Sequence, residues 1–315
     1  MSVLALALAA GVASAQPLAW SWDTSQPVHY HAEITRERYD GDWHMAIQNL
    51  EARAQLTNLA MDMSCGVVDV LKKGWAIECS FHNVVVSGTA FGGEQDKLNT
   101  IFEEYVGYLN QASGIFEMSA AGRIKSFDIR TFESRSERES QVIDAMRMLM
   151  VRPFALLELE LPKSGDDKGK AWKQGGSPLL TQLRSSYGTA GAVIIKHSVE
   201  SSEGTLVQIG TEGRATVAYG LAVESDGTKN IALDLAGAAS FDNALGVLVA
   251  RDSMVVGNFT ASAAASGPTD HFREIGTLVR IDAIPLPPAP TLEPAPEPEL
   301  EPAVEPAVEP APAAD

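Results

Sequence analysis

The two cysteines of this sequence, Cys65 and Cys79, are the first residues whose type and spacing could do chemistry. They could form a metal clip, a redox pair or a disulfide. A tetrahedral metal site needs more ligands than these two thiolates, and a redox pair is more often C-x-x-C at the start of a helix. A turn at Lys72-Lys73-Gly74 places the two cysteines opposite each other on neighbouring strands. We therefore predict a cross-strand disulfide, which is typical of an exported protein.

The register that pairs the cysteines also sorts the other side chains of this hairpin by polarity. One face would carry Leu59, Met61, Met63, Cys65, Val67, Trp75, Ile77, Cys79 and Phe81, and the other would carry Asp62, Ser64, Glu78, Ser80 and His82. Because one register satisfies both patterns, the hairpin is favoured over slipped alternatives.

Two histidines, His29 and His31, have the spacing of a metal-binding pair on one face of a strand. A third, His44, would follow after a hairpin turn at Asp40-Gly41, too far along the strand to reach the same ion. We interpret His29 and His31 as solvent-facing side chains and predict no metal site.

His197 and the pair Glu158 and Glu160 are the candidates for acid–base chemistry. His197 lies on the apolar face of its strand without a nucleophile at recognisable spacing, so we predict a hydrogen-bonded interior histidine. The two glutamates alternate with leucines and could point into a pocket, although a solvated outer face is the commoner arrangement. The sequence also lacks the local motifs of hydrolases, metalloproteases and nucleotide-binding enzymes. We expect a protein that is not an enzyme and uses no cofactor.

The start of the chain, MSVLALALAAGVASAQP, has the apolar run and small-residue site of a signal peptide, although no Lys or Arg precedes the run. We expect residues 1–15 to be removed before Gln16. This run is too short to span a bilayer, and no other run is long enough. The expected location is therefore periplasmic or extracellular, with a bacterial envelope as the first choice.

Residues 285–315 contain 11 of the 17 prolines, seven acidic residues and no Lys or Arg. Such a composition does not build a core, so we predict a disordered acidic tail after a single domain over residues 16–284. The net charge of the whole chain is -17. An acidic protein of this kind is not expected to bind nucleic acid.

Two stretches show the three-and-four spacing of amphipathic helices. One is GEQDKLNTIFEEYVGYLNQASG, and the other is SERESQVIDAMRMLMVRP, which we expect to end before Pro153. Most of the remaining chain alternates apolar and polar residues, above all from Gly191 to Ala283, with turns expected at SSEG, TEG, SDGT and FDNALG. The prediction is an α+β fold, mainly antiparallel: a curved sheet or open half-barrel of roughly ten strands packed on two helices.

Small residues occupy several C-terminal strand positions where large apolar residues are usual. These are Ala218, Gly220, Ala222, Ala236, Ala238, Ala261 and Ala263. On the concave side of a curved sheet they would leave a cavity suited to an apolar ligand. Alternatively, they face solvent or admit a helix closely. If the cavity exists, the candidate lining residues are Met146, Leu149, His197, Tyr219 and Leu221.

The signal peptide, the passage from GIFEMSAAGRIKSFDIRTF into SERESQVIDAMRMLM, and the glycine-punctuated strands after GKAWKQ together resemble exported bacterial proteins of the lipoprotein-carrier type. The resemblance covers about residues 28–283 and is architectural; the disulfide and the tail depart from it. It implies a half-open antiparallel barrel that closes over helices and shelters acyl chains. We therefore expect a non-enzymatic envelope protein that binds an apolar ligand or a lipidated partner. The alternative is a structural or protein-interaction module of the envelope, whose partner is captured through the tail.

Overall fold

The computed structural model describes residues 17–39, 54–90, 93–130, 149–162, 171–174, 189–219, 229–260 and 271–284, together with Ser140. All of them belong to one compact unit, Met1–Ile284, and Pro285–Asp315 form a second unit. The expected signal peptide and the acidic tail lie outside the described residues.

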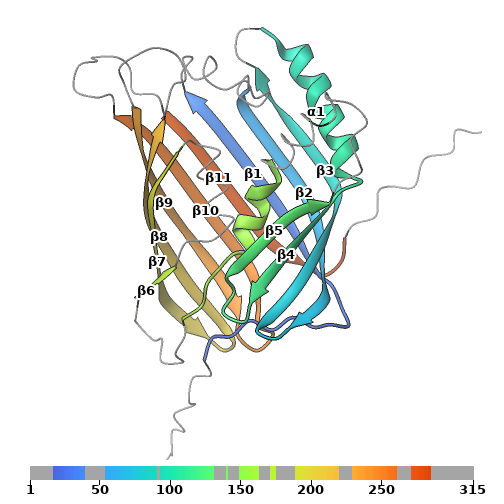
Figure 1. The fold of residues 1–315 in the computed structure, drawn as a ribbon, viewed down its shortest axis with the longest axis vertical. Helices are drawn as coiled ribbons and strands as arrows, with labels where there is room; N and C mark the ends of the chain where they lie inside the picture. The colour runs from blue at the N-terminus through green and yellow to red at the C-terminus, as the bar shows by residue number, and fades with distance from the viewer. Residues whose placement is uncertain are drawn as a thin grey trace, which may run out of the picture. The chain divides into compact units, whose positions relative to one another are not determined.

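Eleven described strands form a single antiparallel sheet. They are β1 (Val28–Tyr39), β2 (Ala54–Leu71), β3 (Gly74–Ala90), β4 (Ser113–Ser119), β5 (Ile124–Arg130), β6 (Ala171–Gln174), β7 (Thr189–Glu203), β8 (Leu206–Tyr219), β9 (Lys229–Asp242), β10 (Val247–Thr260) and β11 (His271–Ile281). Their order is β5-β4-β3-β2-β1-β11-β10-β9-β8-β7-β6, so the first and last strands pair at the centre. The sheet curves around the short helical segment 149–157 (Figure 1). A mainly antiparallel, curved sheet is thus confirmed.

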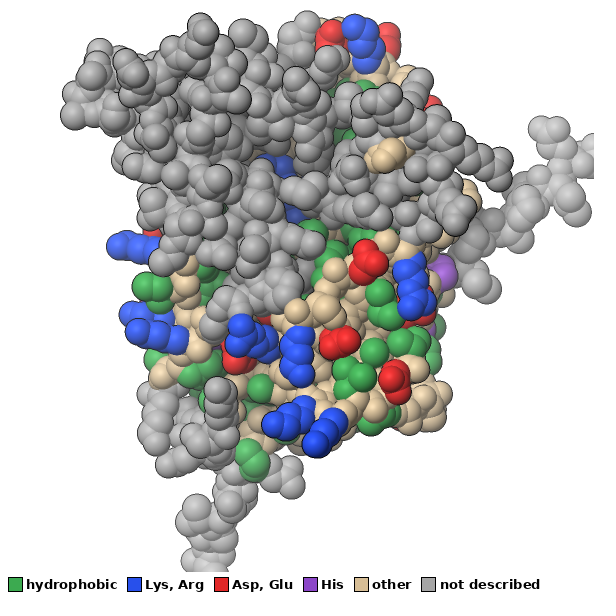
Figure 2. All heavy atoms as spheres, viewed as in Figure 1, with side chains coloured by type: hydrophobic (Ala, Val, Ile, Leu, Met, Phe, Trp, Pro, Cys, Tyr) green, Lys and Arg blue, Asp and Glu red, His purple; other side chains and the backbone are tan. Residues whose placement is uncertain are grey.

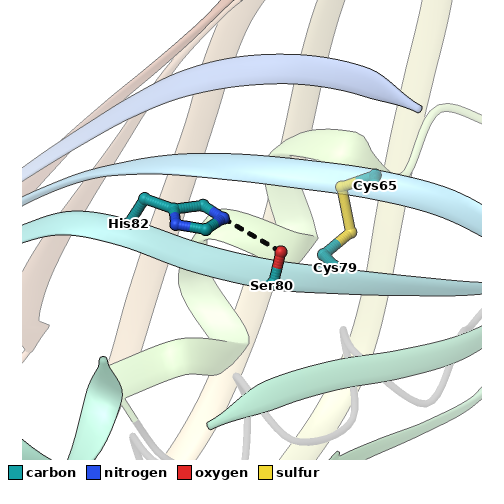
Figure 3. The surroundings of a disulfide bond; sticks show 4 residues. All are labelled: Cys65, Cys79, Ser80 and His82. Atoms are coloured by element: carbon teal, nitrogen blue, oxygen red, sulfur yellow. Dashed lines mark hydrogen bonds between the residues drawn. A yellow bond between two sulfur atoms is a disulfide. The ribbon is translucent and has the colours of Figure 1, made fainter. Parts of the chain in front are cut away.

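The β2–β3 hairpin has the predicted register around its disulfide (Figure 3). Cys65 lies directly opposite Cys79, the two Cα atoms are 4.0 Å apart, and the sulfurs are bonded. The predicted apolar face is buried at Leu59, Met61, Met63, Cys65, Ile77, Cys79 and Phe81. Asp62, expected on the polar face, is only 5% exposed because partners on neighbouring strands cover it.

The register predicted for β1 is wrong. A hairpin turn at Asp40-Gly41 would place the residues after the turn beside β1, but Ile34 of β1 lies opposite Leu59 of β2. The other edge of β1 pairs with β11, so both sides of the strand are occupied. A local turn signal competes here with long-range pairing of larger apolar strands, and the long-range pairing determines the register. Residues 40–53 lie outside the described part of the chain.

The C-terminal strands follow the expected meander except at one turn. The turn at SSEG joins β7 to β8 with Gly204 at φ 59°, and the turn at FDNALG joins β9 to β10 with Gly246 at φ 68°. The turn expected at TEG is wrong, because Gly213 lies inside β8. A Cβ there would come within 3.1 Å of the Ile194 carbonyl oxygen, so this glycine permits close strand contact. The expected turn at SDGT lies outside the described residues.

The first predicted helix is α1 (Gln95–Leu109), which buries Leu98, Phe102, Tyr105 and Leu109 as its spacing indicated. It packs on β3, where Gly88 leaves room for the Phe102 ring. In Figure 1 it lies along the end of β3.

The second helical stretch was expected to end before Pro153, and this expectation is wrong. Residues 149–157 form one continuous helical run that includes the proline. A proline inside a helix removes one backbone hydrogen bond. The loss is offset because Met150, Phe154 and Leu157, which flank the proline, are fully buried. Among the described residues, no helix is long and apolar enough to cross a membrane.

We call residues 149–161 the crossing segment, because its far end contacts both edges of the sheet. At the β5 edge, Glu158 Oε1 accepts a hydrogen bond from the Ile124 backbone N–H (3.3 Å). At the β6 edge, Trp172 Nε1 donates to the carbonyl oxygen of Glu160 (2.6 Å). Leu159 lies between these two glutamates, and its carbonyl oxygen accepts a hydrogen bond from Trp20 Nε1 (2.9 Å). These contacts hold the segment across the opening of the curved sheet.

Candidate ligand cavity

A cavity of about 80 Å³ lies between the crossing segment and the C-terminal half of the sheet. Its apolar walls come from β1, β7, β9, β10 and the crossing segment: Ile34, Ile195, Leu235, Val255 and Leu156. Leu235 and Val255 are half-buried, whereas Leu156 is only 4% exposed. Gly276 of β11 lets Leu156 approach, since a Cβ there would lie 3.1 Å from the leucine Cδ2.

Buried charges occupy one part of this cavity. Glu274 Oε2 lies 2.9 Å from Arg152 Nε and 3.9 Å from Arg36 Nε. All three side chains are at most 11% exposed. Removing charges from water costs several kcal/mol per ion, so such a cluster persists only because the charges pair with each other. The surface differs: charges of both signs are interspersed with apolar side chains over the described part of the face in Figure 2.

Arg251, which also lines the cavity, binds the end of the helical segment 149–157. Its Nη1 donates to the carbonyl oxygens of Leu156 (3.1 Å), Ala155 and Glu158. These carbonyls have no partner within a helix at its C-terminus, where a cation is favourable. Burial lowers the pKa of Arg251 to about 10, although the negative charges of Glu158 and Asp252 oppose this shift.

Of the lining residues predicted from the sequence, only Leu149 and His197 have described side chains. Leu149 is buried in the core and does not line this cavity. His197 does not line this cavity, but it is hydrogen-bonded to Thr211, which does. Tyr219 ends β8, but its side chain is outside the description, as are Met146 and Leu221 entirely.

The small residues do not create the cavity in the way the sequence suggested. Ala236 borders it, but alternation along β9 turns its methyl group to the face opposite Leu235, between the exposed residues Glu212 and Met254. Ala238 lies on the same outer face and is half-buried. Of the other small residues, Ala218 has no described side chain, and positions 220, 222, 261 and 263 lie outside the described residues.

The residues that sequence reasoning missed are Arg152, Arg251 and Glu274. Glu274 carried a usable signal, since it occupies an inward position between Phe272 and Gly276 in an otherwise apolar alternation. A charge at such a position needs a buried partner. Arg251 gave no such signal, because a register shift between Leu248 and Ala250 changes the alternation of β10.

His197 is a buried histidine with two hydrogen-bond partners, as predicted. With its proton on Nε2 it donates to Gln174 Oε1 (2.7 Å), and its Nδ1 accepts from the Thr211 hydroxyl (3.0 Å). The Trp172 ring covers it at 5.5 Å between ring centres. Burial, and secondarily the charge of Arg251, lowers the pKa of His197 to about 3. The imidazole is therefore neutral and joins β6, β7 and β8.

This histidine gives the stability of the protein a pH dependence. Because the folded pKa lies below the ordinary value of 6.5, the stabilisation is complete above that value and is lost as the pH falls towards 3. Between about pH 7 and about pH 5, the free energy of unfolding should fall by about 2 kcal/mol more in the wild type than in His197→Gln. Urea unfolding at both pH values measures the difference. Equal decreases in the two proteins would contradict this assignment.

The glutamate pair does not form an exposed acidic face. Glu158 is 2% exposed and is bonded to β5, and Glu160 is half-buried. The carboxylate of Glu158 satisfies the Ile124 N–H at a sheet edge, which is a structural contact.

The outer face of β1–β3 carries a second polar cluster. His31 Nδ1 lies 2.7 Å from Asp62 Oδ1, and Asn83 Nδ2 donates to the other Asp62 oxygen (2.7 Å). Burial lowers the pKa of His31, but hydrogen bonds and charges from Asp62 and Glu33 outweigh this and raise it. His31 is thus partly covered rather than freely solvated.

This outer cluster does not assemble a catalytic triad. His82 bonds Ser80 (3.1 Å; Figure 3), whereas Asp62 bonds His31, so no one histidine joins a serine to an acid in these contacts. In the described part of the chain, no three His, Cys, Asp or Glu residues are grouped to hold a metal ion.

Comparisons with known proteins do not identify a family for this chain. No protein-family model and no curated protein matches the chain. One solved structure that resembles it is described as lipid-protein interactions in lipovitellin, with 10% sequence identity and a TM-score of 0.46. The match covers 83% of this chain, which therefore spans only 25% of the length of the lipovitellin chain.

Proposed function

We propose that this chain is a non-enzymatic binding protein that shelters an apolar ligand, or the acyl chain of a lipidated partner, between its curved sheet and the crossing segment. The observation that carries the proposal is the cavity beside Leu156, with the half-buried side chains of Leu235 and Val255 in its wall. Apolar surface in a concave site favours ligands that lose hydrated apolar area on binding.

The cavity must widen to hold such a ligand. Its volume of about 80 Å³ is below the roughly 300–1,000 Å³ of small-molecule sites. The two sides of the crossing segment differ in how they are packed. Towards β3–β5, Phe154 contacts the rings of Phe81, Phe116 and Phe127 at 4.8–5.9 Å between centres. Towards β10 and β11, Arg152 and Arg251 make polar contacts beside the cavity, and Leu156 lies close to Gly276.

Widening is therefore expected on the side of β10 and β11. The aromatic cluster keeps the crossing segment on the N-terminal half of the sheet, where a Cβ on Gly114 would come within 2.2 Å of the Phe154 ring. Separating the segment from the C-terminal half exposes the apolar side chains of Leu156 and Leu235 to a ligand that covers them again. The same proposal includes export, supported by the buried Cys65–Cys79 disulfide.

Native mass spectrometry of the mature protein, purified gently from its own host, tests this function. We expect an excess mass of lipid size that organic-solvent extraction removes. Leu235→Trp, which fills the cavity from an inward position, should reduce the occupied fraction. Val279→Trp is the matched control, because Val279 is 46% exposed on the neighbouring outer face and lines no part of the cavity. A bare polypeptide mass in repeated preparations would instead favour an interaction module that acts through the acidic tail.

A further inference from the structure

The segment that precedes β1 bridges the two parts of the fold that the proposed widening would separate. We call residues 17–22 the strap; none of them is helical or belongs to a strand. On one side, Trp20 Nε1 donates to the carbonyl oxygen of Leu159 in the crossing segment (2.9 Å). On the other side, the Ser21 N–H donates to the carbonyl oxygen of Gly246 in the β9–β10 turn (2.8 Å). If the crossing segment moves away from β9 and β10, at least one of these hydrogen bonds must break.

The Trp20 side chain also lies in line with the cavity. Leu235 and Gly237 of β9 line the cavity, and the next inward residues along this strand are the buried Ala239 and Phe241. The Trp20 ring packs edge-on against Phe241, with 5.2 Å between the ring centres. A ligand chain that leaves the cavity along this face of β9 therefore meets Trp20 about 13 Å beyond Gly237. The strap thus occupies the place where such a chain would continue.

The closed position of the strap leaves one of its buried polar groups unsatisfied. Trp20 and Trp22 are at most 4% exposed, so closing the strap removes much apolar surface from water. The indole N–H of Trp22, however, has no hydrogen-bond partner in the part of the chain that the structure describes. A buried donor without a partner opposes the closed position, since water satisfies it once the strap has left. A ligand that covers Phe241 again would replace the apolar contact that Trp20 gives up.

We propose that the strap closes the ligand site, and that an apolar ligand displaces Trp20 and Trp22 and takes their place against Phe241. This inference rests on the proposed function and specifies how access to its site is controlled. The ligand competes with the strap, so its apparent affinity rises with the fraction of molecules in which the strap is open. Weakening the strap should therefore tighten ligand binding, whereas weakening a merely structural segment would not.

Hydrogen exchange of the mature, delipidated protein tests the displacement without any substitution. The probe is dodecan-1-ol, a neutral amphiphile with a single apolar chain. At saturating probe, the amides of Ala19 and Ser21 should exchange at least about fivefold faster than without it, because displacement breaks their bonds to Asn243 Oδ1 and Gly246 O. Binding that only stabilises the folded protein slows exchange. Faster exchange at these two amides is therefore specific to release of the strap.

A single substitution in the strap tests the competition. Trp20→Phe keeps an aromatic ring beside Phe241 but removes the donor to Leu159 O. Calorimetric titration should show dodecan-1-ol bound about fivefold more tightly, the effect of one lost hydrogen bond. Trp172→Phe is the matched control, because Trp172 Nε1 donates in the same way to the next carbonyl oxygen, that of Glu160, from the β6 edge. It should leave the affinity within about twofold of the wild type.

The outcomes separate the strap from the proposed function. If dodecan-1-ol binds while the amides of Ala19 and Ser21 keep their exchange rates, displacement is overturned and the apolar binding function still stands; this result decides the matter even if Trp20→Phe does not fold. Unchanged or weaker binding by a folded Trp20→Phe would also overturn it. So would equal tightening in Trp172→Phe, because any loosening of the crossing segment would then have the same effect. Binding by neither the wild type nor the variants would overturn the proposed function itself.

Discussion

Replacing Arg251 with methionine is expected to lower the free energy of unfolding by about 3 kcal/mol, because it leaves buried polar groups without their cation. Arg251 Nη1 serves the carbonyl oxygens of Ala155, Leu156 and Glu158 at once. Methionine keeps much of the apolar volume of the side chain but donates no hydrogen bond. Urea unfolding followed by tryptophan fluorescence, for which the chain has 5 tryptophans, measures the loss.

The control for this prediction is Arg214→Met, on the solvent-exposed side of β8. Arg214 Nε lies 3.2 Å from Asp234 Oδ1, and both side chains are more than half exposed. An exposed pair of this kind contributes about 0–1 kcal/mol. If Arg251→Met were as mild as Arg214→Met, the crossing segment would not depend on Arg251, and its attachment to the C-terminal half would have to come from its other contacts, such as the Arg152–Glu274 ion pair and the Trp172–Glu160 hydrogen bond.

Local patterns were sufficient to predict the elements whose partners are close in sequence. The disulfide hairpin was predictable because a single register satisfied the cysteine pair and the polarity of the flanking residues. Helix α1 was predictable because its buried residues Leu98, Phe102, Tyr105 and Leu109 follow helical spacing. In both cases the information lies within about twenty residues.

The closing of the sheet could not be predicted in this way. The pairing of β1 with β11 joins Val28–Tyr39 to His271–Ile281, and neither strand alone indicates which neighbour it takes. The Asp40-Gly41 turn signal even favours a different partner for β1. The helix end predicted at Pro153 was wrong for a similar reason. A proline locally favours the end of a helix, but the burial of Phe154 and Leu157 outweighs this effect.

The cavity shows the same limit at the level of single residues. Its charged residues come from β1, β10, β11 and the crossing segment, so Arg36, Arg152, Arg251 and Glu274 meet only after the sheet has closed. Glu274 alone shows a sequence signal, its inward position in an apolar alternation, and the three arginines look like ordinary charged residues. The cavity therefore depends on long-range topology, which also explains why the small alanines of β9 did not indicate where it lies.

Removing the disulfide between β2 and β3 should make the fold less stable. The double substitution Cys65→Ala and Cys79→Ala should lower the free energy of unfolding by about 3 kcal/mol, the chain-entropy value for residues 14 apart in sequence. Reduction of the wild type should reach nearly the same stability, and a reductant should not affect the variant further. Urea unfolding with and without reductant provides the comparison, and a reductant effect in the variant would contradict the disulfide as its cause.

The position of this disulfide also predicts what its loss should spare. Cys65 and Cys79 lie on β2 and β3, in the half of the sheet that holds the aromatic cluster around Phe154. The cavity lies on the other side of the crossing segment, against β7–β11. Under conditions where the variant remains folded, its affinity for an apolar ligand should therefore stay within about twofold of the wild type, since distant sites act nearly independently. A large loss of affinity would mean that the ligand moves the crossing segment against the N-terminal half as well, and that the aromatic cluster is part of the binding site.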